Sequence, residues 1–138
     1  MKLLALLSLF LAPLLTPVPQ DHPAYAVGQV WEYHARPQDS GSLIKIQQIE
    51  RDPRGEPIYH ISVIGFAIGT SVNEIGHLPV SRATLDASVT RLATSTAKFP
   101  DAAPGISEWR AAKGGVFNIP VAAILDILEK GIAQPPPT

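Results

Sequence analysis

The histidines of this 138-residue sequence are the side chains best suited to do chemistry. An imidazole can exchange a proton near neutral pH or bind a metal ion, and His34, His60 and His77, with the carboxylates of Glu32 and Glu74, form the set that could do either. Catalytic zinc requires three converging ligands and an open position, but these residues show no metal-ligand spacing. The nearest pair, Glu74 and His77, could meet if their segment turns tightly. The sequence therefore predicts neither a metal site nor a bound cofactor.

Structural roles account for the histidines more simply. His60 has the position of a strand residue that hydrogen-bonds beneath a helix, and His77 that of a loop residue that bonds a backbone group near the start of a helix. A small metal-dependent or hydrolytic enzyme would need His60, His77 and Glu74 to meet in one pocket. That enzyme remains an alternative to a non-enzymatic protein.

Other reactive motifs are missing from the sequence. It contains no Gly-x-Ser-x-Gly elbow to activate a serine, and the glycines of residues 65–69 lack the Lys-Ser or Lys-Thr of a phosphate-binding loop. Because the chain has no cysteine, it can form no disulfide, thiolate nucleophile or zinc knuckle. These absences favour a protein that binds over one that catalyses.

Charge argues against a nucleic-acid partner. The chain has 11 Lys and Arg against 12 Asp and Glu, a net charge of −1, whereas binding to phosphates requires clustered basic residues. Its length suits a single small domain with one hydrophobic core.

The first 20 residues have the pattern of a secretory signal peptide. Lys2 precedes an apolar run over residues 3–15, and prolines and polar residues follow that run. The run is too short and too interrupted for a transmembrane helix, so we expect no stable membrane span after cleavage, which we place between residues 18 and 27. A buried or interfacial N-terminal helix is the alternative. Since export without cysteine is typical of a bacterial periplasm, we expect a soluble periplasmic or secreted protein.

Alternating apolar residues then predict strands in the first half of the mature chain. Strands are expected at residues 27–35, 43–49 and 58–68, with Trp31 and Tyr33 facing the core. The segments between them are rich in proline, glycine, aspartate and serine, which favour turns. An antiparallel meander is the simplest way to pair these strands.

Helical patterns follow in the second half of the chain. Ser81 can cap an amphipathic helix over residues 81–95, and a short helical turn is expected around Trp109, which would pack onto the sheet. An apolar stripe predicts a further helix over residues 120–130.

These elements define an expected architecture. The fold class is α+β, with a three- or four-stranded antiparallel meander and two or three helices packed on one face. It forms a single domain over residues 27–132, followed by a disordered tail at residues 133–138.

Six short segments of the chain also resemble known sequences: GQVWEY at 28–33, Arg36-Pro37, the strand at 42–50, YHISV at 59–63, HLPVS at 77–81 and GVFNIPV at 115–121. Together they are similar to a group of small bacterial proteins of unknown function. The resemblance implies a compact bacterial α+β domain, and it implies no particular reaction, ligand or cofactor.

The function expected from these observations is protein binding. We expect a non-enzymatic protein that binds another exported protein, as an inhibitor or immunity protein does. Recognition is expected on exposed loops held by a rigid scaffold, with Asn73, Glu74 and His77 in a loop at residues 69–79, and with the turn at residues 38–42. A small-ligand carrier or structural envelope protein, with a cavity between sheet and helices, is a further alternative.

Overall fold

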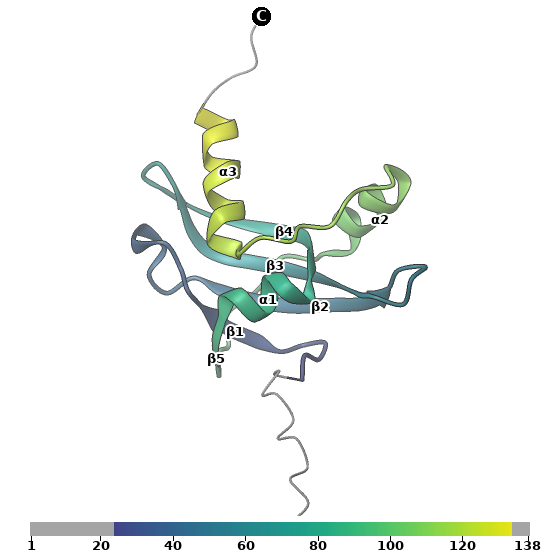
Figure 1. The fold of residues 1–138 in the computed structure, drawn as a ribbon. Coiled ribbons are helices and arrows are strands. Elements are labelled where there is room, and N and C mark those ends of the chain that lie inside the picture. Colours follow the sequence, from purple (N-terminus) through teal and green to yellow (C-terminus); the bar gives the residue numbers. More distant parts are fainter. Residues whose placement is uncertain (1–23, 134–138) are drawn as a thin grey trace, which may run out of the picture.

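The computed structural model describes residues 24–133 (Figure 1). The expected signal peptide, and the tail beyond residue 133, lie outside the described residues. Over residues 24–133, no helix is long and apolar enough to cross a membrane.

The described residues form an α+β fold with one five-stranded antiparallel sheet and three α-helices. The strands are β1 (Val30–Tyr33), β2 (Leu43–Arg51), β3 (Pro57–Ile68), β4 (Ser71–Ser81) and β5 (Val89–Leu92). The helices are α1 (Arg82–Ser88), α2 (Ala103–Ala111) and α3 (Val121–Ala133), with a single 3-10 turn, η1 (Pro37–Asp39). The predicted fold class is confirmed, but the sheet has more strands than the three or four that the sequence predicted.

The sheet order is β4-β3-β2-β1-β5. The first four strands form the expected meander, since each pairs with the next along the chain. After β4 the chain crosses the sheet through α1. β5 then pairs with the side of β1 that faces away from β2. The two edges of the sheet are therefore β4 and β5, as Figure 1 shows.

The segment expected to be a loop at residues 69–79 is instead the greater part of β4. Gly69 and Thr70 form a two-residue turn in which Gly69 adopts a φ of +58°, as a tight hairpin requires. β4 then follows β3 with two irregularities in the register. Pro79 has no N–H to donate to a neighbouring strand. It is tolerated in β4 because β4 is an edge strand.

The helix expected over residues 81–95 is shorter than predicted. Ser81 caps it as expected, with its Oγ accepting the Thr84 N–H at 3.2 Å. The helix ends at Ser88, and the chain continues as β5, in which Val89 pairs with Tyr33. The apolar spacing of residues 85, 89 and 92 is compatible with a helix. In the structure, residues 89–92 instead pair with the open side of β1 as strand β5.

Helices cover both faces of the sheet. One face forms the main core with α1 and α3, and it contains Trp31 and Tyr33, both 6% exposed as predicted. Along β3, Tyr59, Ile61 and Val63 point into that core. The alternating residues of β3 point to the opposite face, where α2 packs. The expectation that all helices share one face is therefore wrong for α2.

Candidate functional site

The three residues expected to bind a partner all lie in β4. Glu74 is exposed and pairs with Ile64 of β3, and Asn73 is partly exposed, with its amide donating to the Ser71 carbonyl at 2.9 Å. His77 is partly buried and points to the α2 face. Among the described residues, no hydrogen bond or ion pair joins Glu74 to a histidine. Glu74 and His77 therefore do not form the pair that the sequence allowed.

His77 contacts His60, and His60 contacts a carboxylate that the sequence analysis did not select. The Nε2 of His77 lies 2.7 Å from the Nδ1 of His60, and the Nε2 of His60 lies 2.5 Å from Glu50 Oε1. Glu50 therefore takes the place expected for Glu74. The three side chains come from three neighbouring strands, and His60 in the middle is fully buried.

Helix α2 packs over these three side chains. The Arg110 guanidinium is 3.1 Å from the same Glu50 oxygen, and the Trp109 ring packs edge-on against His60, with centroids 5.0 Å apart. We call Glu50, His60, His77, Trp109 and Arg110 the imidazole cluster. It joins the sheet to α2, as was expected for Trp109.

Hydrogen-bond geometry fixes the protonation pattern of the neutral rings. An ionised Glu50 carboxylate can only accept, so His60 donates from Nε2 and its Nδ1 must accept. His77 then donates from Nε2, and its Nδ1 carries the lone pair that could act as a base. Burial opposes ionisation of Glu50, but the hydrogen bonds from His60 and Arg110 outweigh it and hold the carboxyl pKa below its usual value.

Metal ligands and a hydroxyl nucleophile were the two kinds of partner considered for the histidines. Within residues 24–133, no three His, Asp or Glu side chains are placed to hold a metal ion. The nearby Ser62 hydroxyl donates to the Gly76 carbonyl at 2.7 Å and is not bonded to either imidazole. The contacts that the cluster does make connect α2 to strands β2, β3 and β4.

The sequence contained a signal for Glu50 that alternation alone did not reveal. The Asp52–Glu56 turn aligns β2 with β3, so that Glu50 pairs with Ile58, two residues from His60. The pairing is regular from there to Gln48 and His60, so Glu50 lies on the same face as His60, and the register shift between Ile46 and Gln48 comes only after that pair. Counting the hairpin register outward from the turn would have placed Glu50 beside His60.

The outer edge of β4, which faces away from β3, is covered by other described segments only along the second half of the strand. Near its end, Phe117 donates to the Pro79 carbonyl and accepts from the Ser81 N–H, both at 2.9 Å. Residues 100–101 lie against Gly76, where an added Cβ would approach the Asp101 carbonyl to 3.1 Å. Along residues 71–75, no other described segment pairs with the strand.

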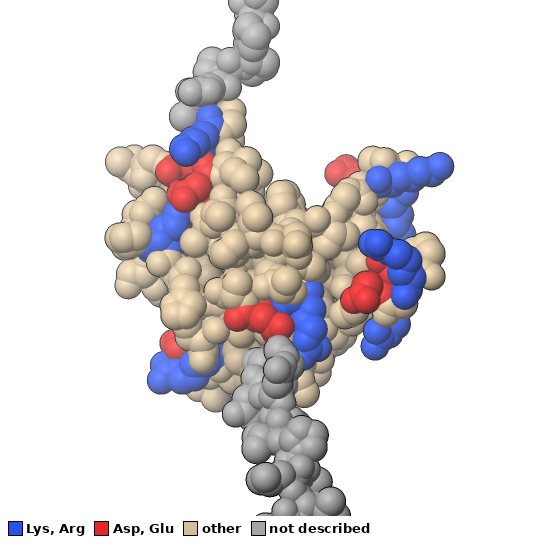
Figure 2. Space-filling model, in the orientation of Figure 1, with Lys and Arg blue, Asp and Glu red and all other residues tan. Residues whose placement is uncertain are grey.

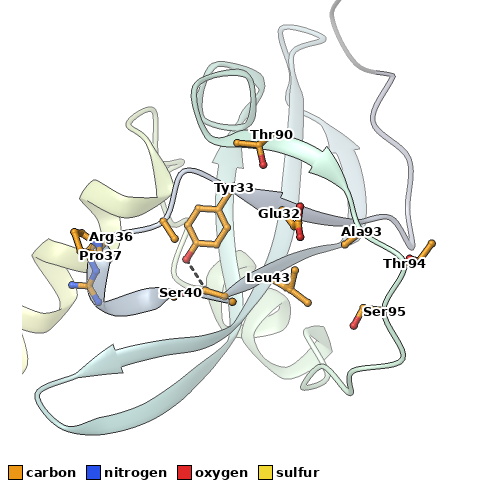
Figure 3. A pocket seen from close by; sticks show the side chains of 13 residues that line it. Glu32, Tyr33, Arg36, Pro37, Ser40, Leu43, Thr90, Ala93, Thr94 and Ser95 are labelled. Atoms are coloured by element: carbon orange, nitrogen blue, oxygen red, sulfur yellow. Dashed lines mark hydrogen bonds between the residues drawn. The ribbon is translucent and has the colours of Figure 1, made fainter.

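The turn expected to take part in binding borders a cleft between β1, β5 and residues 36–43 (Figure 3). This cleft has a volume of about 640 Å³, and hydroxyls from Ser40, Thr90 and Thr94 line it. The Tyr33 hydroxyl is held by the Ser42 hydroxyl at 2.7 Å. The cleft is open to solvent, and its lining is partly polar and partly apolar.

Charges of both signs are interspersed over the face drawn in Figure 2, and no extended basic patch is visible there. Comparison of the chain with known proteins found no matching family model, no matching curated protein and no matching solved structure.

Proposed function

We propose that this protein is an exported, periplasmic, non-enzymatic protein that acts by binding another exported protein, as inhibitors and immunity proteins do. The proposed contact surface is the open half of the β4 edge, from Ser71 to Ile75. The observation that supports it is the unpaired outer side of these residues in a strand that is otherwise held firmly by β3.

An open strand edge offers its backbone to a partner. Ile68 and Ser71 are the last pair beside the Gly69–Thr70 turn, so they bond to each other. Because bonding alternates along an antiparallel pair, the N–H and C=O of Val72 point away from β3. These groups fit an extended segment that adds to the sheet as a further strand.

The side chains of the edge suit recognition in the same way. Val72 is 80% exposed, which is unusual for a valine in a strand, and Glu74 is exposed one pleat further along. The edge residues would therefore give a partner strand one apolar contact and one charge. Asn73 and Glu74 remain the residues proposed for specificity, with the backbone of Val72 supplying affinity.

The other candidate functions have less support. An enzyme built on His60, His77 and Glu74 would need the three to converge, but no hydrogen bond or ion pair joins Glu74 to either ring among the described residues, and the nearby Ser62 hydroxyl donates to the Gly76 carbonyl. A small-ligand carrier would use a cavity between sheet and helices, whereas the cleft of Figure 3 lies at the β1 and β5 side of the molecule.

Substituting Val72 tests the proposal directly. Val72→Pro removes the outward N–H without removing a bond to β3, since proline is tolerated on edge strands. Val72→Thr keeps the N–H and the branched shape. Tagged wild-type and variant proteins would be expressed with the native leader, cross-linked in the periplasm and recovered, and captured proteins identified by mass spectrometry.

We expect one identified exported protein to be captured by the wild type and by Val72→Thr, and to be lost with Val72→Pro and weakened by Glu74→Arg. Titration of the two purified proteins would then reproduce that order of affinities. Equal capture by Val72→Pro and Val72→Thr would reject the β4 edge as the contact surface. Recovery of the tagged protein in the cytosol with its first methionine would reject the proposed export.

A further inference from the structure

Helix α2 is attached to the sheet by few contacts. Residues 93–102 before it and 112–120 after it contain no helix or strand apart from the bridge at Phe117. Its only fully buried residue is Ile106, which is 4% exposed. The imidazole cluster therefore supplies a large share of the contacts that hold α2.

The closest of these contacts is made around His77. An added Cβ at Gly105 would come within 2.5 Å of the His77 Cβ, so the helix backbone lies directly against this side chain. On the other side, Trp109 fills the space between the two imidazoles and the backbone of Gly114. Because of this direct contact, a change in the position or charge of the His77 ring acts on α2 directly.

The two rings can hold only a limited number of protons at this distance. One proton added at His77 Nδ1 leaves both existing hydrogen bonds in place. If both rings are protonated at both nitrogens, His60 Nδ1–H and His77 Nε2–H point at each other across 2.7 Å, and two like charges adjoin. The doubly protonated pair cannot keep this geometry.

The charged and titratable groups around the rings come from every element that packs there: Glu50 on β2, His60 on β3, His77 on β4, Arg110 on α2, and Asp101 and Glu108, which line the groove beside His77. Glu50 favours the first proton through its carboxylate. Arg110 shares that carboxylate and offsets part of this effect.

We propose that the imidazole cluster is a pH-sensitive switch, which holds α2 on the sheet while the two rings are hydrogen-bonded and releases it when acidification turns both into imidazolium ions. The rest of the sheet does not depend on α2, because its main core lies on the opposite face. Release would separate the two walls of the groove between β4 and α2 and would uncover the His60 ring, which is buried while α2 is docked.

The titration of His77 agrees with this geometry. Burial of the ring, followed by repulsion from His60, lowers the His77 pKa to about 4, although Glu50 acts in the opposite direction. Once α2 is released, His77 would titrate near its ordinary value of about 6.5. Docking of α2 is therefore weakened about tenfold for each pH unit between these two values, because release takes up a proton.

Amide hydrogen exchange tests the switch on the whole mature protein. Protection factors, corrected for the intrinsic rate at each pH, would be measured for the amides of residues 106–112 and for those of α3. We expect α2 protection to fall about tenfold between pH 6 and pH 5 while α3 protection stays constant. Agreement of the α2 values within about twofold between pH 7 and pH 4.5 would overturn the proposal.

Two variants distinguish protonation of His77 from the effects of acid on other groups. His77→Gln cannot take up the proton, so we expect its α2 protection, whatever its starting value, to be independent of pH over this range. His34→Gln, at an exposed histidine, should keep the wild-type response. A fall in α2 protection of the same size and midpoint in His77→Gln would assign the effect to other groups and overturn the proposal.

Discussion

Arg36 and Asp39 form a buried ion pair in which two guanidinium nitrogens face the two carboxylate oxygens, at 2.6 and 3.1 Å. Their side chains are 5% and 0% exposed. The same two residues bond the backbone of Ala67, since Asp39 accepts its N–H at 2.8 Å and Arg36 donates to its carbonyl at 2.7 Å. The pair thereby ties η1 to the end of β3.

Removing the charge of Asp39 should be strongly destabilising. Asp39→Asn keeps the shape of the side chain but leaves a buried guanidinium without its main counter-charge, which costs about 3–5 kcal/mol of unfolding free energy. Urea unfolding followed by circular dichroism measures it. Asp126→Asn is the matched control, because Asp126 also bonds Arg36 but has a side chain that is 55% exposed. We expect the control to cost about 1 kcal/mol or less; equal effects would contradict the role of the buried pair.

The same substitution in two helices should have opposite effects. Gly105→Ala places a methyl group 2.5 Å from the His77 Cβ, and this overpacking should cost about 1–3 kcal/mol. Gly131→Ala in α3 meets no atom within 4 Å, so the higher helix propensity of alanine should stabilise the protein by up to about 1 kcal/mol. Thermal unfolding of the two variants measures the difference. A stabilised Gly105→Ala would show that α2 does not pack against His77.

The elements with regular patterns were predictable from the sequence. The helix expected at residues 120–130 corresponds to α3, and the strand expected at 58–68 to β3. β4 was missed because Gly76 and Pro79 lower strand propensity and because an irregular register interrupts its alternation. In an edge strand these residues are compatible with pairing on one side only, which depends on the tertiary context of β3.

The candidate site was predictable in part. His60 and His77 were selected by residue type, and the structure brings them together through the β3–β4 hairpin. Glu50 was not selected, because its position beside His60 follows from the register of a different hairpin. The packing of Trp109 onto the sheet was predicted, but its contact with His60 and the contact of Arg110 with Glu50 were not, because no local pattern shows which residues a distant helix will meet.

A buried serine, Ser88, connects α1 to the start of α3 through hydrogen bonds. Ser88 is 1% exposed, and its Oγ accepts the Val121 N–H at 3.0 Å while donating to the Thr84 carbonyl at 2.5 Å. Ser88→Ala leaves the first N–H of α3 buried without this acceptor, which should cost about 1–3 kcal/mol. Ser71→Ala, at an exposed position of β4, is the control and should change the unfolding free energy by less than about 0.5 kcal/mol. Similar values for the two variants would show that Val121 finds another acceptor.

The global stability of the protein should fall in acid partly because of His77. The pKa of His77 is lowered to about 4 in the folded protein, by burial and then by His60, whereas in the unfolded chain it lies near 6.5. Between these pH values the unfolded chain binds a proton that the folded protein does not, so the unfolding free energy decreases as the pH falls. Carboxylates such as Glu50 add to this decrease at lower pH, because their pKa is also lowered by folding. The contribution of His77 is therefore the difference between wild type and His77→Gln, measured by urea unfolding at a series of pH values. We expect that difference to be constant above pH 7, to change most steeply between pH 6.5 and pH 4, and to level off below; parallel curves over the whole range would show that His77 titrates alike in the folded and unfolded protein.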